Sequence, residues 1–206
     1  MRRGVALLLW LAAAPVFADH PGADRLDQVM AAKEPAFEAT DTRDMPDLEV
    51  VTADGQELEL DEFADQVIVL SFLPEECAEP CAAQQAALGK LGRNLDATPM
   101  RDMVTFVTVR PEQSLPAEAD AANRLQVSPR AGSVPDLAAI FAPLSRREDG
   151  QPLVHVIDRA TRHAAIFHGS AFDPLNMTLY INGLTNSPPS EPGFVDRVLG
   201  FFWERT

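Results

Sequence analysis

The sequence has few cysteines and few basic residues, and both shortages restrict the classes of protein to which it can belong. The 206 residues include only two cysteines, so no network of disulfides holds the fold together. Lysine and arginine together number 17 against 31 aspartate and glutamate residues, which gives a formal net charge of −14. A surface with this charge repels nucleic acid and anionic lipid, so we expect neither as a partner.

The sequence also lacks an apolar run of the roughly 20 residues that a transmembrane helix needs. The run at Val5–Ala14 is shorter, follows Arg2 and Arg3, and is closed by Pro15. Small residues then lead up to Ala18, as before a signal-peptidase cleavage site. The pattern predicts a signal peptide over residues 1–18, cleaved after Ala18, and a periplasmic protein that does not span the membrane after cleavage. The alternative is a segment retained as an uncleaved anchor.

The distribution of apolar and turn residues predicts an α/β domain. Residues 67–73, VIVLSFL, are apolar throughout, as in a strand buried on both faces. Asp54-Gly55 lies between two alternating stretches and predicts a hairpin. The other expected elements are a helix from the cysteines to about 95, a strand at 103–109, helices at 112–126 and 135–145, a strand at 154–158, an edge strand at 163–169 and a helix from 174.

Strand, helix and strand, followed by a strand pair and a helix, is the order of the thioredoxin-like fold, a central mixed sheet flanked by helices. The upstream hairpin and the segment between 112 and 152 are additions to that plan, and a C-terminal extension follows it. We therefore expect a signal peptide at 1–18, an N-terminal arm at 19–45, the thioredoxin-like domain at 46–185, and a linker and C-terminal helix at 186–206.

Cys77 and Cys81 directly follow the first buried strand and begin the next helix. Unpaired N–H groups at a helix start favour a thiolate, which is both a nucleophile and a ligand for soft ions such as Cu(I). A disulfide between residues four apart closes too small a loop to stabilise a fold much, which favours a chemical role over a structural one. The neighbouring carboxylates of Glu75, Glu76 and Glu79 oppose a strongly acidic thiol and favour a bound cation. An inert disulfide or two unused thiols is the alternative.

Three stretches resemble the Sco/SenC family of copper-handling, thioredoxin-like proteins: VIVLSFLPEECAEPCAAQQAALGKL, MVTFVTVRPE and VIDRATRHAAIFHG. The resemblance runs from about Pro46 to Leu184. It implies that both cysteines and one histidine bind Cu(I), and that the protein takes part in assembling copper centres of respiratory oxidases or reduces thiols in preparation for that step. The partner would be a copper-centre apoprotein or a client protein that carries a disulfide.

The sequence departs from the family at the histidine. In the family an Asp-His pair places the histidine seven residues before the isoleucine that corresponds to Ile157, whereas this chain has Asp149-Gly150 there. The family's proline after each cysteine is also absent, since Ala78 and Ala82 follow Cys77 and Cys81. His155, inside the strand at 154–158, is the candidate substitute ligand, and a core or surface position is the alternative for it.

The stretch QPLVHVID also resembles the proline-led strand of thioredoxin and TlpA-like reductases, in which a cis-proline faces the cysteine pair and docks the substrate. This makes Pro152 a candidate site residue, and an ordinary proline that begins a strand is the alternative. His163 and His168 lie on the expected edge strand and are expected to be solvated.

Three functions follow from these residues. The first is a Sco-like protein that handles Cu(I), thiols or both, with Cys77, Cys81 and His155 or a client residue as ligands. The second is a thiol–disulfide oxidoreductase without a copper role, in which Cys77 attacks, Cys81 resolves and Pro152 docks the substrate. The third is a non-catalytic binding module that keeps the fold.

Overall fold

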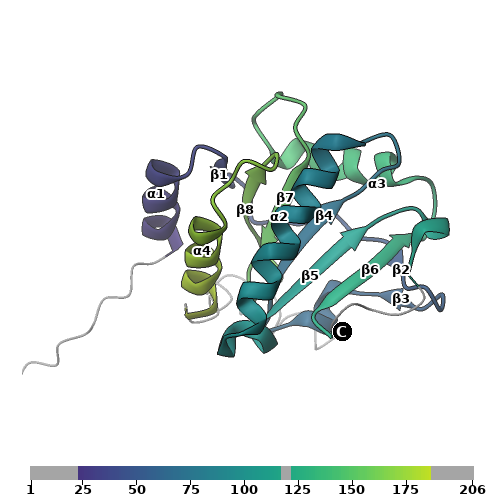
Figure 1. Cartoon of the computed structure of the whole chain (residues 1–206), viewed down its shortest axis with the longest axis horizontal. Helices are drawn as coiled ribbons and strands as arrows, with labels where there is room; N and C mark the ends of the chain where they lie inside the picture. The colour runs from purple at the N-terminus through teal and green to yellow at the C-terminus, as the bar shows by residue number, and fades with distance from the viewer. Residues whose placement is uncertain (1–22, 117–121, 187–206) are drawn as a thin grey trace, which may run out of the picture.

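The computed structural model describes residues 23–116 and 122–186 (Figure 1). The expected signal peptide at 1–18 and the C-terminal helix within 186–206 lie outside the described residues. The strands are β1 Phe37–Ala39, β2 Val50–Val51, β3 Glu57–Leu58, β4 Val67–Phe72, β5 Val104–Val109, β6 Arg124–Pro129, β7 Leu153–Ile157 and β8 His163–His168. The α-helices are α1 Ala23–Lys33, α2 Glu79–Asp96, α3 Val134–Phe141 and α4 Pro174–Asn186. The 3-10 helices are η1 Leu60–Phe63, η2 Pro99–Met103, η3 Glu112–Ser114 and η4 Ala142–Leu144.

The strands form one mixed sheet of eight, in the order β1-β8-β7-β4-β5-β6-β2-β3. β4 lies in the interior, parallel to β5 and antiparallel to β7, and all six of its residues are buried. Its continuous apolar sequence is explained by this position, because both of its faces contact packed side chains. The thioredoxin-like α/β fold is therefore confirmed.

Helices cover both faces of the sheet. α1, α2 and α4 lie on one face, where α2 crosses in front of β4 and β5, and α3 lies on the other (Figure 1). Leu88, Leu91 and Leu95 recur along α2 and pack into the first core, which also contains Tyr180 of α4. Phe141 of α3 packs into the second core. Because every second residue of a strand faces the same side, β4 and β7 contribute to both cores.

The turn chemistry of two predicted elements is also confirmed. β2 and β3 pair as the predicted hairpin, in which Gly55 has a φ of +79°. The backbone N–H of Gly55 donates to the carbonyl of Thr52 at 2.9 Å. The last described helix begins at Pro174, directly after Asp173, as predicted.

The helix predicted over residues 112–126 is wrong. η3 ends at Ser114, and β6 then runs parallel to β5, with Val107 opposite Leu125. Leu125 and Val127 have the two-residue spacing of a strand and both pack into the core that contains α3. Pairing with β5 satisfies the backbone groups of that strand, which a helix in this segment would leave open.

The prediction that residues 163–169 form an edge strand is wrong as well. β1, from the segment assigned to an N-terminal arm, pairs with β8 and places Phe37 opposite Phe167. His163 and His168 are consequently 0% and 5% exposed instead of solvated. None of the helices in residues 23–116 and 122–186 is long and apolar enough to cross a membrane.

Candidate functional site

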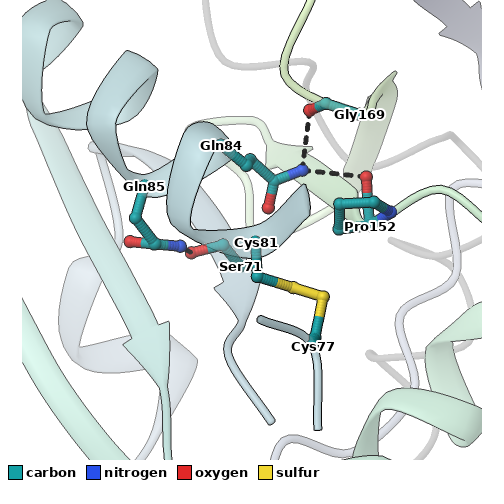
Figure 2. The surroundings of a disulfide bond; sticks show 7 residues. All are labelled: Ser71, Cys77, Cys81, Gln84, Gln85, Pro152 and Gly169. Atoms are coloured by element: carbon teal, nitrogen blue, oxygen red, sulfur yellow. Dashed lines mark hydrogen bonds between the residues drawn. A yellow bond between two sulfur atoms is a disulfide. The ribbon is translucent and has the colours of Figure 1, made fainter. Parts of the chain in front are cut away.

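Cys77 and Cys81 form a disulfide at the point where the chain leaves β4 and begins α2 (Figure 2). Their Cα atoms are 5.5 Å apart, within the range that a disulfide requires. Cys81 is the third residue of α2 and is 1% exposed, whereas Cys77 precedes the helix and is half-buried. Cys77 is therefore the more accessible of the two cysteines.

The start of α2 supplies the electrostatic environment of the pair. Ala78 is the N-cap and makes no side-chain capping bond, and Pro80 occupies the first turn. The partial positive charge of the helix N-terminus is therefore not neutralised by a capping side chain, which favours a thiolate there. Glu75, Glu76 and Glu79 are exposed around this turn, and their charges act in the opposite direction.

A cavity of about 290 Å³ opens beside the disulfide. Its wall is mostly apolar and comes from the end of β4, the helix α3 and the segment that leads into β7. The lining residues are Phe72, Pro74, Cys77, Cys81, Pro135, Ala138, Ala139, Ala142, Gly150, Gln151, Pro152, Leu153 and His155. All four candidate site residues, Cys77, Cys81, Pro152 and His155, thus come together at one cavity.

Pro152 lies immediately before β7, and its carbonyl is held by two donors. The backbone N–H of Gly169 and the side-chain Nε2 of Gln84 each donate to Pro152 O, both at 2.8 Å. No peptide bond within residues 23–116 and 122–186 is cis, so Pro152 does not have the cis geometry of the reductase prolines. It lines the cavity together with both cysteines.

Gln84 is a site residue that the sequence analysis missed. Its side chain is fully buried, and its Nε2 donates to Gly169 O at 2.9 Å as well as to Pro152 O (Figure 2). One amide thus ties α2 to the first residue before β7 and the first residue after β8. A glutamine three residues after Cys81, on the buried side of an Ala/Leu helix, was the available signal.

His155 is buried between aromatic rings and a second histidine. Phe72 and Phe141 lie with ring centroids 6.1 and 5.5 Å from its own, and its Nδ1 is 3.2 Å from Nε2 of His163. Burial, followed by the charges of His163 and His168, lowers the pKa of His155 to about 3. The imidazole is therefore neutral at physiological pH, which is the form that binds metal.

The three copper ligands expected from the sequence, Cys77, Cys81 and His155, all line this cavity. Gly150, where the family has its histidine, lines the same cavity as both cysteines. In residues 23–116 and 122–186, no three or more His, Cys, Asp and Glu side chains are grouped so as to hold a metal ion. His155 shares the cavity with the two sulfurs without completing such a group.

The loop that carries Gly150 is fastened to β1 through Glu38. The carboxylate of Glu38 accepts from the backbone N–H of Arg146 at 2.7 Å and from Ser145 Oγ at 2.9 Å, and is 2.7 Å from His168 Nε2. Burial alone would raise the pKa of Glu38, but these hydrogen bonds outweigh it and lower the pKa. The buried carboxylate of Glu38 thus positions one wall of the cavity.

The comparisons with known proteins give a structural likeness only. No family model and no curated protein matches the sequence. BsSco, a member of the Sco family of cytochrome c oxidase assembly proteins, superposes with a TM-score of 0.55 at 12% identity, over 72% of this chain and 97% of its own. A SCO1/SenC family lipoprotein from Bacillus anthracis gives 0.56 at 16% identity, over 71% and 98%.

The chain has a Sco-like fold. A secreted thiol-disulfide isomerase from Corynebacterium glutamicum is also similar, with a TM-score of 0.51 at 16% identity over 72% of this chain and 92% of its own. At these identities the likeness concerns the fold and not the activity.

Proposed function

We propose that this chain is an exported, Sco-like thiol–disulfide protein whose Cys77–Cys81 pair exchanges with the cysteines of a client during assembly of a respiratory copper centre. The observation that carries the proposal is the disulfide itself, placed at a helix start and open to an apolar cavity. The pair adds little to stability because the loop it closes is small, so its placement beside a cavity is better explained by chemistry.

The difference in burial supports separate roles for the two cysteines. In the reduced protein the thiolate of Cys77 attacks a client disulfide, forms a mixed disulfide and releases one client thiolate, which takes up a proton. The thiolate of Cys81 then attacks the Cys77 sulfur, restores the Cys77–Cys81 disulfide and releases the second client thiol. An external dithiol re-reduces the pair and is itself oxidised to a disulfide. The wall around Pro152 and α3 holds the client segment during these steps.

Trapping tests this order of events. In Cys81→Ser the mixed disulfide with a client cannot be resolved, so we expect a covalent adduct on Cys77 that a reductant releases. Cys77→Ser is the matched control and should give far less adduct, because the remaining cysteine is buried. Equal trapping by both variants would contradict the roles assigned. A Cys77→Ser/Cys81→Ser double variant that fully replaces the wild type in a deletion strain would instead indicate a non-catalytic binding module.

Cu(I) as cargo is the second candidate, because His155 lines the same cavity as both sulfurs and is neutral. Two thiolates and an imidazole are a suitable ligand set for Cu(I), and a client residue could replace the imidazole. Titration of the reduced protein with Cu(I) against a competing chelator should show one-to-one binding that the double serine variant lacks. His155→Phe weakens binding only if the imidazole is a ligand. Equal binding by wild type and double variant would contradict the copper role and leave an oxidoreductase without copper.

A further inference from the structure

The side-chain oxygen of Gln84 is a buried acceptor without a donor. Nε2 of Gln84 donates two hydrogen bonds, whereas Oε1 has no partner among the described residues. Exchanging the positions of the amide oxygen and nitrogen would not give Oε1 a donor, because Pro152 and Gly169 both present carbonyl oxygens, which require the nitrogen. A buried acceptor left without a donor costs free energy, so such an atom in a native site calls for an explanation.

The helix geometry identifies the group that can supply the donor. Side chains on an α-helix point back toward its N-terminus, so Gln84 covers the turn that carries Cys81, three residues earlier. Figure 2 shows the amide oxygen of Gln84 turned away from the two carbonyls and toward this turn. Cys81 is 1% exposed and is bonded to Cys77, so its sulfur carries no hydrogen in the disulfide form.

We infer that Gln84 Oε1 accepts a hydrogen bond from the Cys81 thiol when the pair is reduced, so that Gln84 stabilises the dithiol relative to the disulfide. Reduction breaks the S–S bond and adds two electrons and two protons, which an external dithiol supplies as it becomes a disulfide. One of those protons resides on Cys81 Sγ and becomes the donor that Oε1 lacks. Gln84 thus positions Pro152 and also shifts the redox equilibrium of the cysteine pair toward the dithiol. The inference rests on the proposed function, since it requires the pair to cycle.

The redox equilibrium constant of the pair tests the inference. Gln84→Met keeps the length of the side chain and replaces the amide oxygen with a thioether sulfur, which is a much weaker acceptor. The hydrogen bonds to Pro152 and Gly169 are lost in both redox forms. We expect the disulfide of this variant to be about tenfold harder to reduce in dithiol buffers, equivalent to a potential about 30 mV more negative. Gln85→Met is the matched control on the next residue of α2, where Nε2 donates to Ser71 Oγ at 3.0 Å (Figure 2). This control should stay within about twofold of wild type.

A second measurement needs no change at Gln84. In Cys77→Ser the Cys81 thiol is the only one, and its S–H stretching band in the Raman spectrum should lie below that of a solvated cysteine peptide. A band at the frequency of a thiol without an acceptor, or equal equilibrium constants for Gln84→Met and wild type, would overturn the inference. Neither result affects the proposed function, which fails separately if the wild-type pair cannot be reduced or if Cys81→Ser traps no client.

Discussion

Mild acid should destabilise this protein through the buried histidine pair beside the site. The 3.2 Å contact between His155 Nδ1 and His163 Nε2 requires one nitrogen to donate and the other to accept, so the two rings cannot both be protonated. Burial, with the charges of His163 and His168, lowers the pKa of His155 to about 3. Burial, with the nearby charge of Arg43, lowers the pKa of His163 to about 4. The folded state therefore resists protonation at both rings.

The sign and size of the effect follow from these values. Because each folded pKa lies below the unfolded value of about 6.5, the unfolded chain binds more protons, and stability falls as the pH drops below 6.5. At pH 5 the difference amounts to about 2 kcal/mol for one histidine. His155 and His163 are in contact, so their effects are not independent, and we expect a total loss of about 2–4 kcal/mol between pH 7 and 5.

Urea unfolding of the oxidised protein at pH 7, 6 and 5 measures this loss. A variant with His155→Phe and His163→Val removes both titrating rings, and its stability should change little over the same range. Glu38 does not interfere, because its lowered pKa places its contribution at more acidic pH. If wild type and variant lost the same free energy between pH 7 and 5, the assignment of the acid sensitivity to this pair would be refuted.

Two further predictions concern the elements that hold the site. Leu91→Ala removes a fully buried side chain of α2 and should lower the free energy of unfolding by about 3 kcal/mol in urea at pH 7, without changing the cysteine chemistry. A loss below about 1 kcal/mol would contradict the packing. Glu38→Gln removes the carboxylate that holds Arg146, Ser145 and His168, and should cost about 1–3 kcal/mol. Amide hydrogen exchange in residues 145–151 should accelerate in that variant, and unchanged exchange would show that the loop is held by other contacts.

The local sequence pattern was sufficient to predict the central elements of the fold. Three signals follow one another along the chain: the apolar run of β4, the two cysteines, and the helical spacing of Leu88, Leu91 and Leu95 in α2. Each of them predicts its strand, turn or helix from neighbouring residues alone. The same holds for the hairpin at Gly55. The joining of Cys77, Cys81, Pro152 and His155 at one cavity follows from this arrangement, because β7 pairs directly with β4.

The wrong predictions concern segments whose structure depends on pairing with strands that are distant in the sequence. β6 is a strand because β5 provides a partner, and β8 is an interior strand because β1 arrives from far upstream. The burial of His163 depends on that same strand, since Thr40, one residue beyond β1, lies 2.7 Å from its Nδ1. The helical period places Gln84 on the buried side of α2, but its role depends on carbonyls of two other segments that this period does not identify. Partners so distant in sequence leave no periodic signal near the residues they affect.

Adding a possible copper ligand at Gly150, which lines the cavity, can separate the copper function from the thiol function. A Cβ built on Gly150 would meet nothing within 4 Å, so the position has room for a side chain. Its φ of +67° opposes any L residue, and Gly150→His should therefore cost about 1–2 kcal/mol of stability. If the absence of a histidine at this position limits Cu(I) binding, this variant should bind Cu(I) at least tenfold more tightly than wild type in the chelator competition, and Gly150→Asn should not. Equal affinities for all three proteins would mean that a ligand at this position adds nothing, and the disulfide chemistry of Cys77 and Cys81 would then account for the site by itself.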